Sequence, residues 1–444
     1  MKTPICNFVK EYVNKKSHRL HVPGHKGSGF LGVENFDITE IDGADDLYCP
    51  TSIILESENN ASKIYNCPTF YTTEGSSHSI RAMVYLTNLY AKRNNKPNKI
   101  LATRNVHKSF LTVLSLLQIE VDFLFNESTS YLTTNLTPEF LDGYLQSLKE
   151  LPCALYITSP DYLGKVQDIK GLKKVLNKYE ILLLVDNAHG AYLKFLDNSL
   201  FPIDLGADMC ASSAHKTLPV LTGGAYLHLS NRAFELFADD VLTALTTFGS
   251  TSPSYLILQS LDNCNKILSS NYKNNLASTI NKIENLKKDL KLLSYTILDS
   301  EPLKITIKTK PYGYTGNEFV KILYTNNIIP EFYDKDFVVF SFSVNTLDST
   351  YTSIYNLFKD IVKKESILEK CSTITKHERA LSIKDAIFCD YELIDVKDSE
   401  NRIYADINIH CPPAVPIIVP GEIITKEVIK SFIYYNIDKV KVIK

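Results

Sequence analysis

Short apolar runs that end in polar residues alternate with periodic segments through the first half of the chain. Residues 181–185 form an unbroken apolar run that ends at Asp186, and residues 209–211 form a second run, followed closely by Lys216. Runs of this length predict strands buried on both faces of a parallel sheet. Similar runs predict strands at residues 99–102, 121–125, 153–157 and 224–229.

Apolar positions spaced three and four residues apart predict helices between these strands. The first twenty residues form an amphipathic arm, and the periodic segments after it are residues 55–65, 80–90, 111–119, 137–149 and 169–179. Strands that alternate with helices in this way indicate an α/β fold, with a largely parallel sheet covered by helices on both faces.

The pattern changes after about residue 231, where helical periodicity dominates. Residues 276–293 form a long, lysine-rich amphipathic helix of the kind that links two domains. Two strands (303–307 and 337–342) and two helices (316–327 and 353–362) then predict a smaller α+β unit. At 444 residues the chain is too long for one ordinary core. We therefore predict an N-terminal arm with a major domain at residues 1–275, a small α+β domain at 276–365 and a C-terminal domain at 366–444.

Asp186 and Lys216 are the first candidates for chemistry. Ligands of open α/β sheets lie beyond the carboxyl ends of the strands, where both residues are expected. A desolvated lysine can lose its proton and form a Schiff base with pyridoxal phosphate, and an acid can pair with the pyridine nitrogen of that cofactor. The alternative is that Asp186 caps a turn and that Lys216 is solvated.

Gly75, Ser76 and Ser77 lie where a β-rich run leads into a helix. The amides at a helix start bind phosphate well, although serine also serves as an ordinary N-cap. The stretch is neither a P-loop nor a dinucleotide fingerprint. His107 lies at another strand–helix junction, where it could cap the helix or lie flat against a planar cofactor ring.

Composition excludes several classes of function. The net charge of −2 gives no reason to expect nucleic acid or an anionic membrane as partner. His21 and His25 do not form a metal motif, because Pro23 and Gly24 interrupt the helix that would align them. Nine cysteines without a C-x-x-C pair, the lack of a signal-peptide core and the lack of a membrane-length apolar run predict a cytoplasmic protein without a metal site.

Two further stretches are distinctive. D-I-T-E-I-D-G-A-D-D-L carries five carboxylates, which form either a solvated surface or a site for a cationic substrate, with Glu40, Asp45 and Asp46 as candidates for its distal cation. Residues 407–422, I-N-I-H-C-P-P-A-V-P-I-I-V-P-G-E, are punctuated by proline and cannot form a central strand. They predict a rigid, extended loop that shapes a pocket or an interface.

Seven motifs occur in an order that resembles a known family. They are H-V-P-G-H-K-G, D-I-T-E-I-D-G-A-D-D-L, G-S-S, R-N-V-H-K-S, D-N-A-H-G-A-Y, S-A-H-K-T-L and P-P-A-V-P-I-I-V-P-G-E. Together they resemble the pyridoxal-phosphate-dependent ornithine/lysine/arginine decarboxylases of the aspartate-aminotransferase fold, also called fold type I. The chain is similar to the short form of that family, which lacks the additional N-terminal domain of longer members.

The resemblance implies a role for each candidate residue. Lys216 would be the Schiff-base lysine, Asp186 the partner of the pyridine nitrogen, and His107 the residue stacked on the ring. The other residues implied to contact the cofactor are Gly75, Ser76, Ser77, Ser213 and His215 around the phosphate, Ala188 beneath the ring, and His189 near the ring hydroxyl. The family further implies a homodimer or higher homo-oligomer with active sites at the interface. Its reaction converts lysine, ornithine or arginine into a diamine or agmatine and carbon dioxide.

Several residues depart from the family pattern. Asn187 stands where glutamate is usual, Glu74 where asparagine precedes the phosphate glycine, Asp161 within S-P-D-Y, and Ala414 in place of glycine. We expect Glu74 and Asp161 to add negative charge near the phosphate and so to weaken cofactor binding or require a compensating cation. An aminotransferase or another lyase of the same fold, and a non-catalytic descendant, are the alternative functions.

Overall fold

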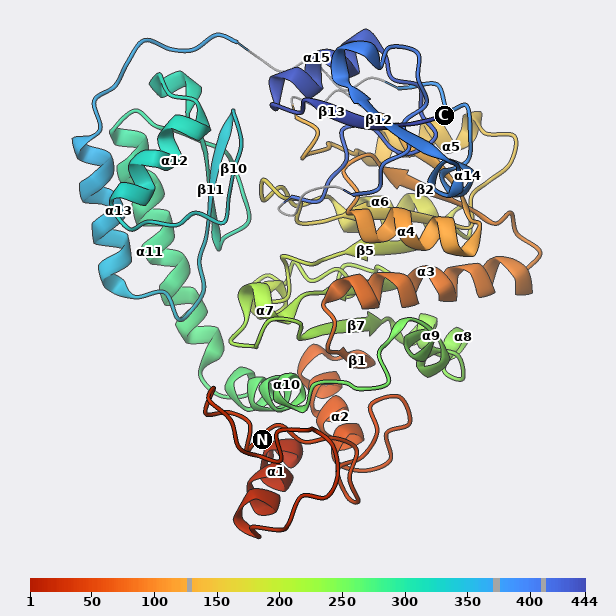
Figure 1. Ribbon diagram of the computed structural model, residues 1–444, viewed down its shortest axis with the longest axis vertical. Helices are drawn as coiled ribbons and strands as arrows, with labels where there is room; N and C mark the ends of the chain where they lie inside the picture. The colour runs from red at the N-terminus through yellow and green to blue at the C-terminus, as the bar shows by residue number, and fades with distance from the viewer. Residues whose placement is uncertain (126–129, 370–375, 409–412) are drawn as a thin grey trace. The chain divides into compact units, whose positions relative to one another are not determined.

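Two units make up the described part of the chain. The computed structural model describes residues 1–125, 130–369, 376–408 and 413–444 (Figure 1). Unit 1 comprises Met1–Asn95 and Leu176–Leu276, and unit 2 comprises Lys96–Val175 and Ala277–Lys444. Two of the three boundaries lie within the helices α6 (Ile169–Asn177) and α11 (Tyr272–Leu292), and the third lies between Asn95 and Lys96. The three-domain division that we predict from the sequence remains a prediction.

Unit 1 contains four strands and the helices that pack on them. The strands, in the order in which they pair, are β1 (Thr69–Thr72), β7 (Ala225–Leu229), β6 (Met209–Ser212) and β5 (Leu182–Asp186). The helices are α1 (Pro4–Asn14), α2 (Ile53–Tyr65), α3 (Ser76–Arg93), α7 (Ala214–Thr217), α8 (Asn231–Phe237), α9 (Val241–Phe248) and α10 (Tyr255–Leu268). β5 and β6 run parallel, whereas β7 is antiparallel to both β6 and β1.

Burial of complete strands explains the unbroken apolar runs. Every residue of β5, β6 and β7 is buried. α3 packs on β6 and β7, and α2 packs on β1. A strand covered on both faces has no solvated side to alternate with, so its sequence is continuously apolar.

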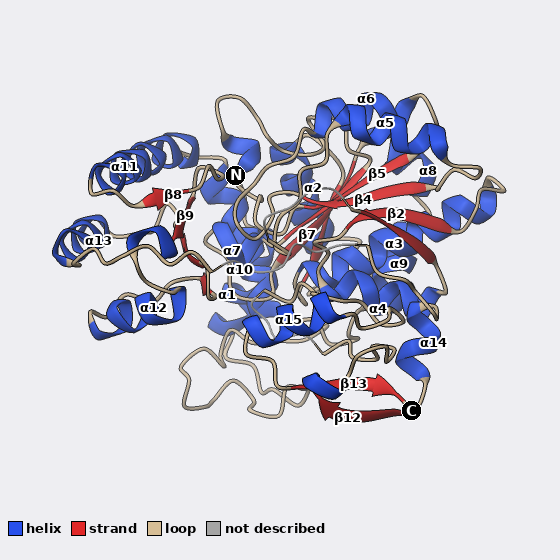
Figure 2. Ribbon diagram, turned by 90° about the horizontal axis from the view of Figure 1, so that it is seen from above, coloured by secondary structure: helices blue, strands red, loops and turns tan. Residues whose placement is uncertain are grey.

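Unit 2 contains three groups of strands. The parallel group is β4 (Ala154–Thr158), β2 (Lys99–Thr103) and β3 (Glu120–Leu124), with β2 in the middle. An antiparallel sheet has the order β10 (Phe332–Tyr333), β11 (Phe337–Ser341), β9 (Lys304–Lys308) and β8 (Thr296–Ile297). The last pair, β12 (Tyr391–Asp395) and β13 (Lys439–Ile443), is also antiparallel (Figure 2). The helices are α4 (Lys108–Leu117), α5 (Pro138–Ser147), α12 (Gly316–Thr325), α13 (Asp348–Asp360), α14 (Ile383–Phe388) and α15 (Lys426–Tyr434).

The predicted elements are confirmed with shifts of a few residues at their ends. All the strands and helices expected up to residue 362 are present, and the mostly parallel strands with covering helices confirm the α/β class. Two short strands, β8 and β10, and the elements after residue 380 have no counterpart in the prediction. None of the described helices combines the length and apolar composition needed to cross a lipid bilayer.

A buried ion pair anchors residues 416–422 of the proline-punctuated segment in unit 2, whereas residues 409–412 of that segment lie outside the described residues. Arg104, which follows β2, lies 3.3 Å from Glu422 through Nη2 and Oε2, and both side chains are buried. The guanidinium also donates to the carbonyl oxygens of Pro416 (3.3 Å) and Ile417 (3.1 Å). Burial lowers the pKa of Arg104, while the Glu422 carboxylate opposes that shift. Arg104 of the motif R-N-V-H-K-S and Glu422 of the last motif are thus joined by a buried ion pair.

We predict that Glu422→Gln destabilises the protein strongly. The substitution leaves the Arg104 cation buried without a counter-charge, which costs about 3–5 kcal/mol. The control is Glu392→Gln, because Glu392 pairs with Arg402 at 2.6 Å where both side chains are partly exposed. Loss of that pair costs below about 1 kcal/mol. The free energies of unfolding from urea titrations compare the two, and equal losses would contradict the anchoring role of Arg104.

Candidate functional site

The parallel pairing of β5 and β6 brings the ends of two strands together in unit 1. Leu184 pairs with Met209 and Asp186 with Ala211, so both strands end at the same edge. The Asp186 carboxylate is buried and accepts a hydrogen bond from the backbone N–H of Ala188 at 3.2 Å. Asp186, the acid predicted from the sequence, is therefore buried at the carboxyl end of β5. Ligands of such sheets bind next to these strand ends.

Asn187 joins the loops that follow the two strands. Its backbone N–H donates to the Ala211 oxygen at 2.9 Å, and its side-chain Nδ2 donates to Ser212 Oγ at 2.9 Å. Asn187 is fully buried, and its Oδ1 has no hydrogen-bond partner among the described residues. The amide in place of the family's glutamate thus binds the neighbouring strand end.

Lys216 lies on α7, directly after β6, and contacts the loop after β5. Its Nζ is 3.2 Å from His189 Nε2, and the imidazole of His189 is buried. An amine at hydrogen-bond distance from an imidazole has a neighbour that can exchange a proton with it. The structure therefore brings Asp186, Ala188, His189 and Lys216 to the same edge of the sheet.

The residues predicted to bind phosphate lie at the start of α3. Gly75 is the N-cap residue, and no side chain caps this end of the helix. Gly75 has φ +72°, a left-handed conformation that glycine adopts without strain. Ser76 is buried and Ser77 is partly buried in the first turn. An uncapped helix start that carries hydroxyl groups suits an anion.

His215 adjoins the start of α3, and Ser213 precedes it at the start of α7. A Cβ atom placed on Gly75 would be 4.0 Å from His215 Cε1, so the imidazole adjoins the glycine. His215 Nδ1 is 3.0 Å from the Gly224 oxygen, which orients the ring. Ser213, the N-cap residue of α7, is buried. Unit 1 therefore contains all the predicted cofactor contacts except His107.

His107 belongs to unit 2, where it caps α4. Its Nδ1 accepts from the backbone N–H of Ser109 at 3.2 Å and is 2.7 Å from Ser109 Oγ. The next residue, Lys108, donates its backbone N–H to the Ala414 oxygen at 2.9 Å. Capping, one of the two roles considered for His107, is thus observed, and stacking on a cofactor ring remains a prediction.

The two acids that depart from the family pattern are engaged by hydrogen-bond donors. Glu74 is exposed and accepts from the Ser250 N–H at 2.6 Å. Asp161, in unit 2, accepts from Leu163 N (3.0 Å), Lys165 N (2.9 Å) and the Thr133 hydroxyl (2.5 Å). Burial raises the pKa of Asp161 to about 6, although these donors act in the opposite direction. Asp161 therefore organises a turn in its own unit.

Asp45, one of the three acids considered for binding the distal cation of the substrate, has a structural role. Asp45 Oδ1 accepts from Thr51 N at 2.8 Å, and its Oδ2 accepts from Ser52 N and Ile54 N, each at 2.9 Å. Burial alone would raise the pKa of Asp45, but these three amides outweigh it and lower the pKa. Both oxygens of Asp45 are thus committed to the start of α2.

The residues of unit 1 fit pyridoxal phosphate. The uncapped helix start suits its phosphate, the buried Asp186 suits a protonated ring nitrogen, and the Lys216 amine suits its aldehyde. Sequence reasoning missed one residue of this neighbourhood: Asn187 appeared only as a departure from the family. Its position directly after Asp186, at the end of a predicted strand, could have indicated that Asn187 belongs to this site.

Family models match most of the chain. The model described as "Orn/Lys/Arg decarboxylase, major domain" matches residues 3–310, and the model described as "Orn/Lys/Arg decarboxylase, C-terminal domain" matches residues 369–439. Among curated relatives, an arginine decarboxylase of Bacillus subtilis is 29% identical over 98% of this chain and 94% of its own length. An arginine decarboxylase of Bacillus anthracis is 27% identical over 96% of this chain and 91% of its own.

Solved structures show the same fold. The lysine decarboxylase of Francisella novicida superimposes with a TM-score of 0.80 at 15% identity, covering 100% of this chain and 81% of its own. The constitutive lysine decarboxylase of E. coli gives 0.79 at 16% identity, covering 100% and 82%. An alanine–glyoxylate aminotransferase from Nostoc covers 69% of this chain and 85% of its own with a TM-score of 0.55 at 15% identity.

We predict that Asp45→Ala lowers the free energy of unfolding by about 1–2 kcal/mol, because three backbone amides lose their acceptor. Asp45 has φ +70°, which asparagine tolerates, so Asp45→Asn is the matched control that keeps one acceptor oxygen. A carboxyl whose pKa is lowered by folding stabilises the protein above its unfolded pKa. That contribution disappears as the pH falls through the folded pKa. The difference between wild type and Asp45→Asn should therefore shrink below about pH 4, and a difference independent of pH would contradict the assignment.

Proposed function

The chain belongs to the ornithine/lysine/arginine decarboxylase family, and from that premise we propose that it removes the α-carboxylate of arginine with pyridoxal phosphate held in unit 1. The enzyme class, a decarboxylase of basic amino acids, follows from the family. The cofactor, the residues that hold it and the choice of arginine are the parts that we propose.

The contact between Lys216 and His189 beside the buried Asp186 carries this proposal. Lys216 Nζ lies 3.2 Å from His189 Nε2, and both residues follow strands that end at the same edge. A proton on the amine can pass to the imidazole, which leaves a nucleophilic lone pair on Nζ. A chain with this fold but without this contact would have no nucleophilic amine to bind the cofactor.

Each residue would do a separate task. The amides and hydroxyls of Ser76 and Ser77 would bind the phosphate, and the negative charge of Asp186 would hold a proton on the ring nitrogen. When bound, pyridoxal phosphate supplies an electron sink for the pair of electrons that carbon dioxide leaves behind. Lys216, with His189 beside it, would supply the proton that replaces the carboxylate on the α-carbon.

Arginine is the proposed substrate because the relatives of Bacillus subtilis and Bacillus anthracis described above, which match nearly the whole chain, are named arginine decarboxylases. A guanidinium requires a carboxylate at the far end of the site. Asp45 is committed to backbone amides, so Glu40 and Asp46 remain the candidates from the acidic segment. Lysine and ornithine differ from arginine in the cation and in the length of the side chain.

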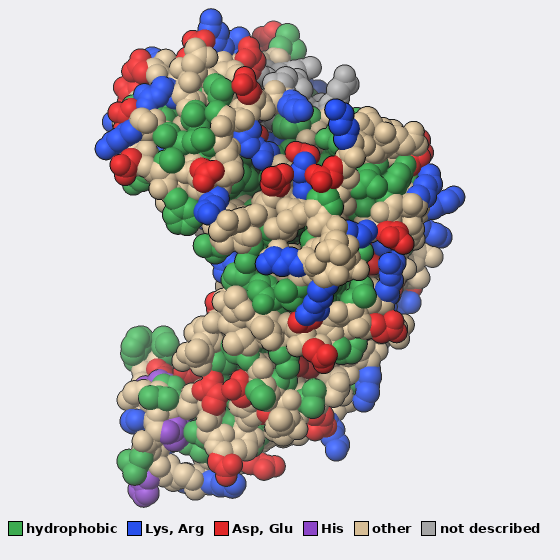
Figure 3. All heavy atoms as spheres, turned by 90° about the vertical axis from the view of Figure 1, so that its right-hand side faces the viewer, with side chains coloured by type: hydrophobic (Ala, Val, Ile, Leu, Met, Phe, Trp, Pro, Cys, Tyr) green, Lys and Arg blue, Asp and Glu red, His purple; other side chains and the backbone are tan. Residues whose placement is uncertain are grey.

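We also propose that the protein is a homodimer that covers an apolar segment near the N-terminus. Leu20 and Phe30 are each 95% exposed, and Val22 and Leu31 are also exposed. Figure 3 shows one face of the molecule, and at its lower end hydrophobic and histidine side chains gather over the N-terminal segment. Contiguous exposed apolar residues of this kind mark interaction surfaces.

We predict that the purified protein converts arginine into agmatine and carbon dioxide. The Lys216→Ala variant should fold normally and lose at least about 1,000-fold in kcat, because no other amine takes its place. The measurement is the identification of the amine formed from arginine, lysine and ornithine, together with the circular dichroism spectrum of the variant.

The matched control is Lys63→Ala, which removes an exposed lysine of α2 and should leave the rate unchanged. Normal turnover by Lys216→Ala would overturn the assignment of the amine. Formation of cadaverine or putrescine in preference to agmatine would overturn the choice of arginine.

We predict a mass of two chains by light scattering at micromolar concentration. Phe30→Ser with Leu31→Ser should shift the protein toward a single chain, because the exposed apolar area is reduced. A wild-type protein with the mass of one chain would contradict the proposed dimer.

A further inference from the structure

One edge of β12 in unit 2 is not paired with any other described strand. β12 pairs with β13 on one side only (Figure 2), whereas the other side of β13 is bonded to residues 403–405. A two-stranded sheet is marginally stable by itself, and a strand with a free edge can pair with a strand of another chain. The free edge of β12 is therefore a candidate interaction surface.

The register shows which backbone groups of β12 point away from β13. Val396, directly after β12, donates its N–H to the Asp438 oxygen at 2.9 Å. Because alternate residues of an antiparallel strand bond to the same neighbour, the even-numbered residues of β12 bond to β13. The N–H and C=O groups of the odd-numbered residues, Tyr391, Leu393 and Asp395, thus point to the free edge.

The side chains of these odd-numbered residues face solvent. Val440 and Val442 of β13 are buried in a core cluster against which Ile394 packs, so the even-numbered side chains of the pair face inward. On the outer face, Tyr391 is 52% exposed and Leu393 is 57% exposed. The free edge therefore presents unpaired backbone groups and apolar side chains together, and burial of that apolar surface would be favourable.

The edge lacks the features that usually prevent association of strands. Proteins protect an edge strand with lysine, proline or unpaired charge, and residues 391–395 contain neither lysine nor proline. The Glu392 carboxylate lies 2.6 Å from Arg402, and the Asp395 carboxylate lies 3.9 Å from Lys439. These cations of the same unit reduce the repulsion that the two acids would exert on an approaching acidic strand.

The sequence of β12 is complementary to a second copy of itself. In an antiparallel pair with a two-fold axis at Leu393, this residue lies opposite Leu393 of the partner subunit. Tyr391 lies opposite the partner's Asp395, and Glu392 lies opposite the partner's Ile394. Every outward N–H then meets an outward C=O, and no acid lies directly opposite another acid.

Neighbouring registers are less favourable. An axis at residue 392 brings the two Glu392 carboxylates opposite each other, and like charges at directly opposed positions destabilise a strand pair. An axis at residue 394 leaves Tyr391 beyond the end of the partner's strand. The charges and the backbone groups of β12 therefore favour the same single register.

We propose that two copies of the chain associate through β12, edge to edge and antiparallel about a two-fold axis at Leu393. The result is a four-stranded sheet in the order β13–β12–β12–β13. A two-fold interface uses the same surface on both copies, so it closes and does not propagate into a filament. This interface is separate from the apolar N-terminal segment of the proposed homodimer, and the proposed reaction does not require it.

The association is expected to be weak. A pair of five-residue strands buries little area, and interfaces below about 1,200 Å² are typical of weak complexes. The proposed homodimer would therefore remain the main species at micromolar concentration. Two such dimers would join through β12 at concentrations well above that range.

The first test is a disulfide at the axis. The Cα atoms of opposed residues in a hydrogen-bonded antiparallel pair lie about 5.5 Å apart, which a disulfide can span. Leu393→Cys should therefore link two copies under mild oxidation. Mass spectrometry of the linked peptides identifies this product and separates it from any disulfide of Cys49, an exposed native cysteine. The matched control is Leu347→Cys, at a leucine of the same unit that is 70% exposed, and it should not link.

The second test is the mass of the full chain in sedimentation velocity from micromolar to nearly millimolar concentration. The mass of the wild type should double over this range. Leu393→Lys sets two cations opposite each other at the axis and should abolish the doubling. Leu347→Lys makes the same change at an exposed position away from β12 and should keep it. Circular dichroism checks that both variants are folded.

Doubling that is lost in Leu393→Lys and kept in Leu347→Lys, together with the disulfide at residue 393, supports the proposal. A mass independent of concentration, doubling that persists in Leu393→Lys, or equal linking of the two cysteine variants would overturn it. Phe30→Ser with Leu31→Ser should change the starting mass but keep the doubling, which separates the two interfaces. Agmatine formation by Leu393→Lys should equal that of the wild type, so failure of the β12 interface is distinguishable from failure of the proposed reaction.

Discussion

The parallel pairing of β5 with β6 is the constraint on which the rest of the candidate site depends. It sets the end of the strand that bears Asp186 next to the strand that leads to Lys216, and Asn187 fastens the two loops through Ala211 and Ser212. Because both strands are wholly buried, a shift of register would expose polar backbone and bury the wrong groups. The packing of β5 and β6 in the core therefore fixes the position of Asp186 relative to Lys216.

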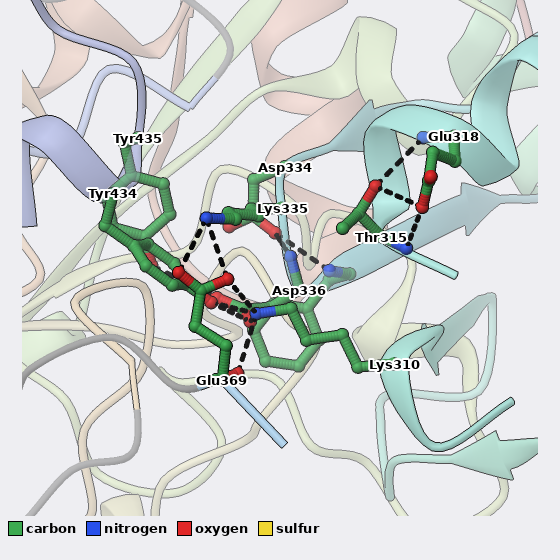
Figure 4. Close-up of polar contacts among 10 residues, drawn as sticks. Lys310, Thr315, Glu318, Asp334, Lys335, Asp336, Glu369, Tyr434 and Tyr435 are labelled. Atoms are coloured by element: carbon green, nitrogen blue, oxygen red, sulfur yellow. Dashed lines mark hydrogen bonds and ion pairs between the residues drawn. The ribbon is translucent and has the colours of Figure 1, made fainter. Parts of the chain in front are cut away.

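Unit 2 uses polar contacts in two different ways. Arg104 contacts the Glu422 carboxylate and two carbonyl oxygens through its terminal nitrogens, and these contacts fix residues 416–422 of the proline-punctuated segment, whereas its Nε has no partner among the described residues. Asp334 acts locally (Figure 4), since its Oδ1 accepts from two backbone N–H groups and closes the turn between β10 and β11. In both cases the paired atoms fix the course of the backbone.

Local sequence patterns predicted most helices and strands. They did not predict elements that depend on pairing with distant parts of the chain. The runs before Asp186 and Lys216 gave β5 and β6 to within a residue or two, because buried strands and amphipathic helices carry their own periodicity. β12 and β13 were not predicted, since each pairs with residues 44 to 52 positions away in the chain and β12 has no fully buried face. The role of Asp45 was equally hidden, because its partners are backbone amides that any sequence would supply.

We propose that one amine, Lys216, and one acid, Asp186, bind a single molecule of pyridoxal phosphate. The most direct measurement is to add the cofactor to the purified protein, reduce with borohydride, digest, and identify the modified residue by mass spectrometry. We expect one pyridoxyl group per chain, on Lys216. Modification spread over several surface lysines, or none at all, would contradict it.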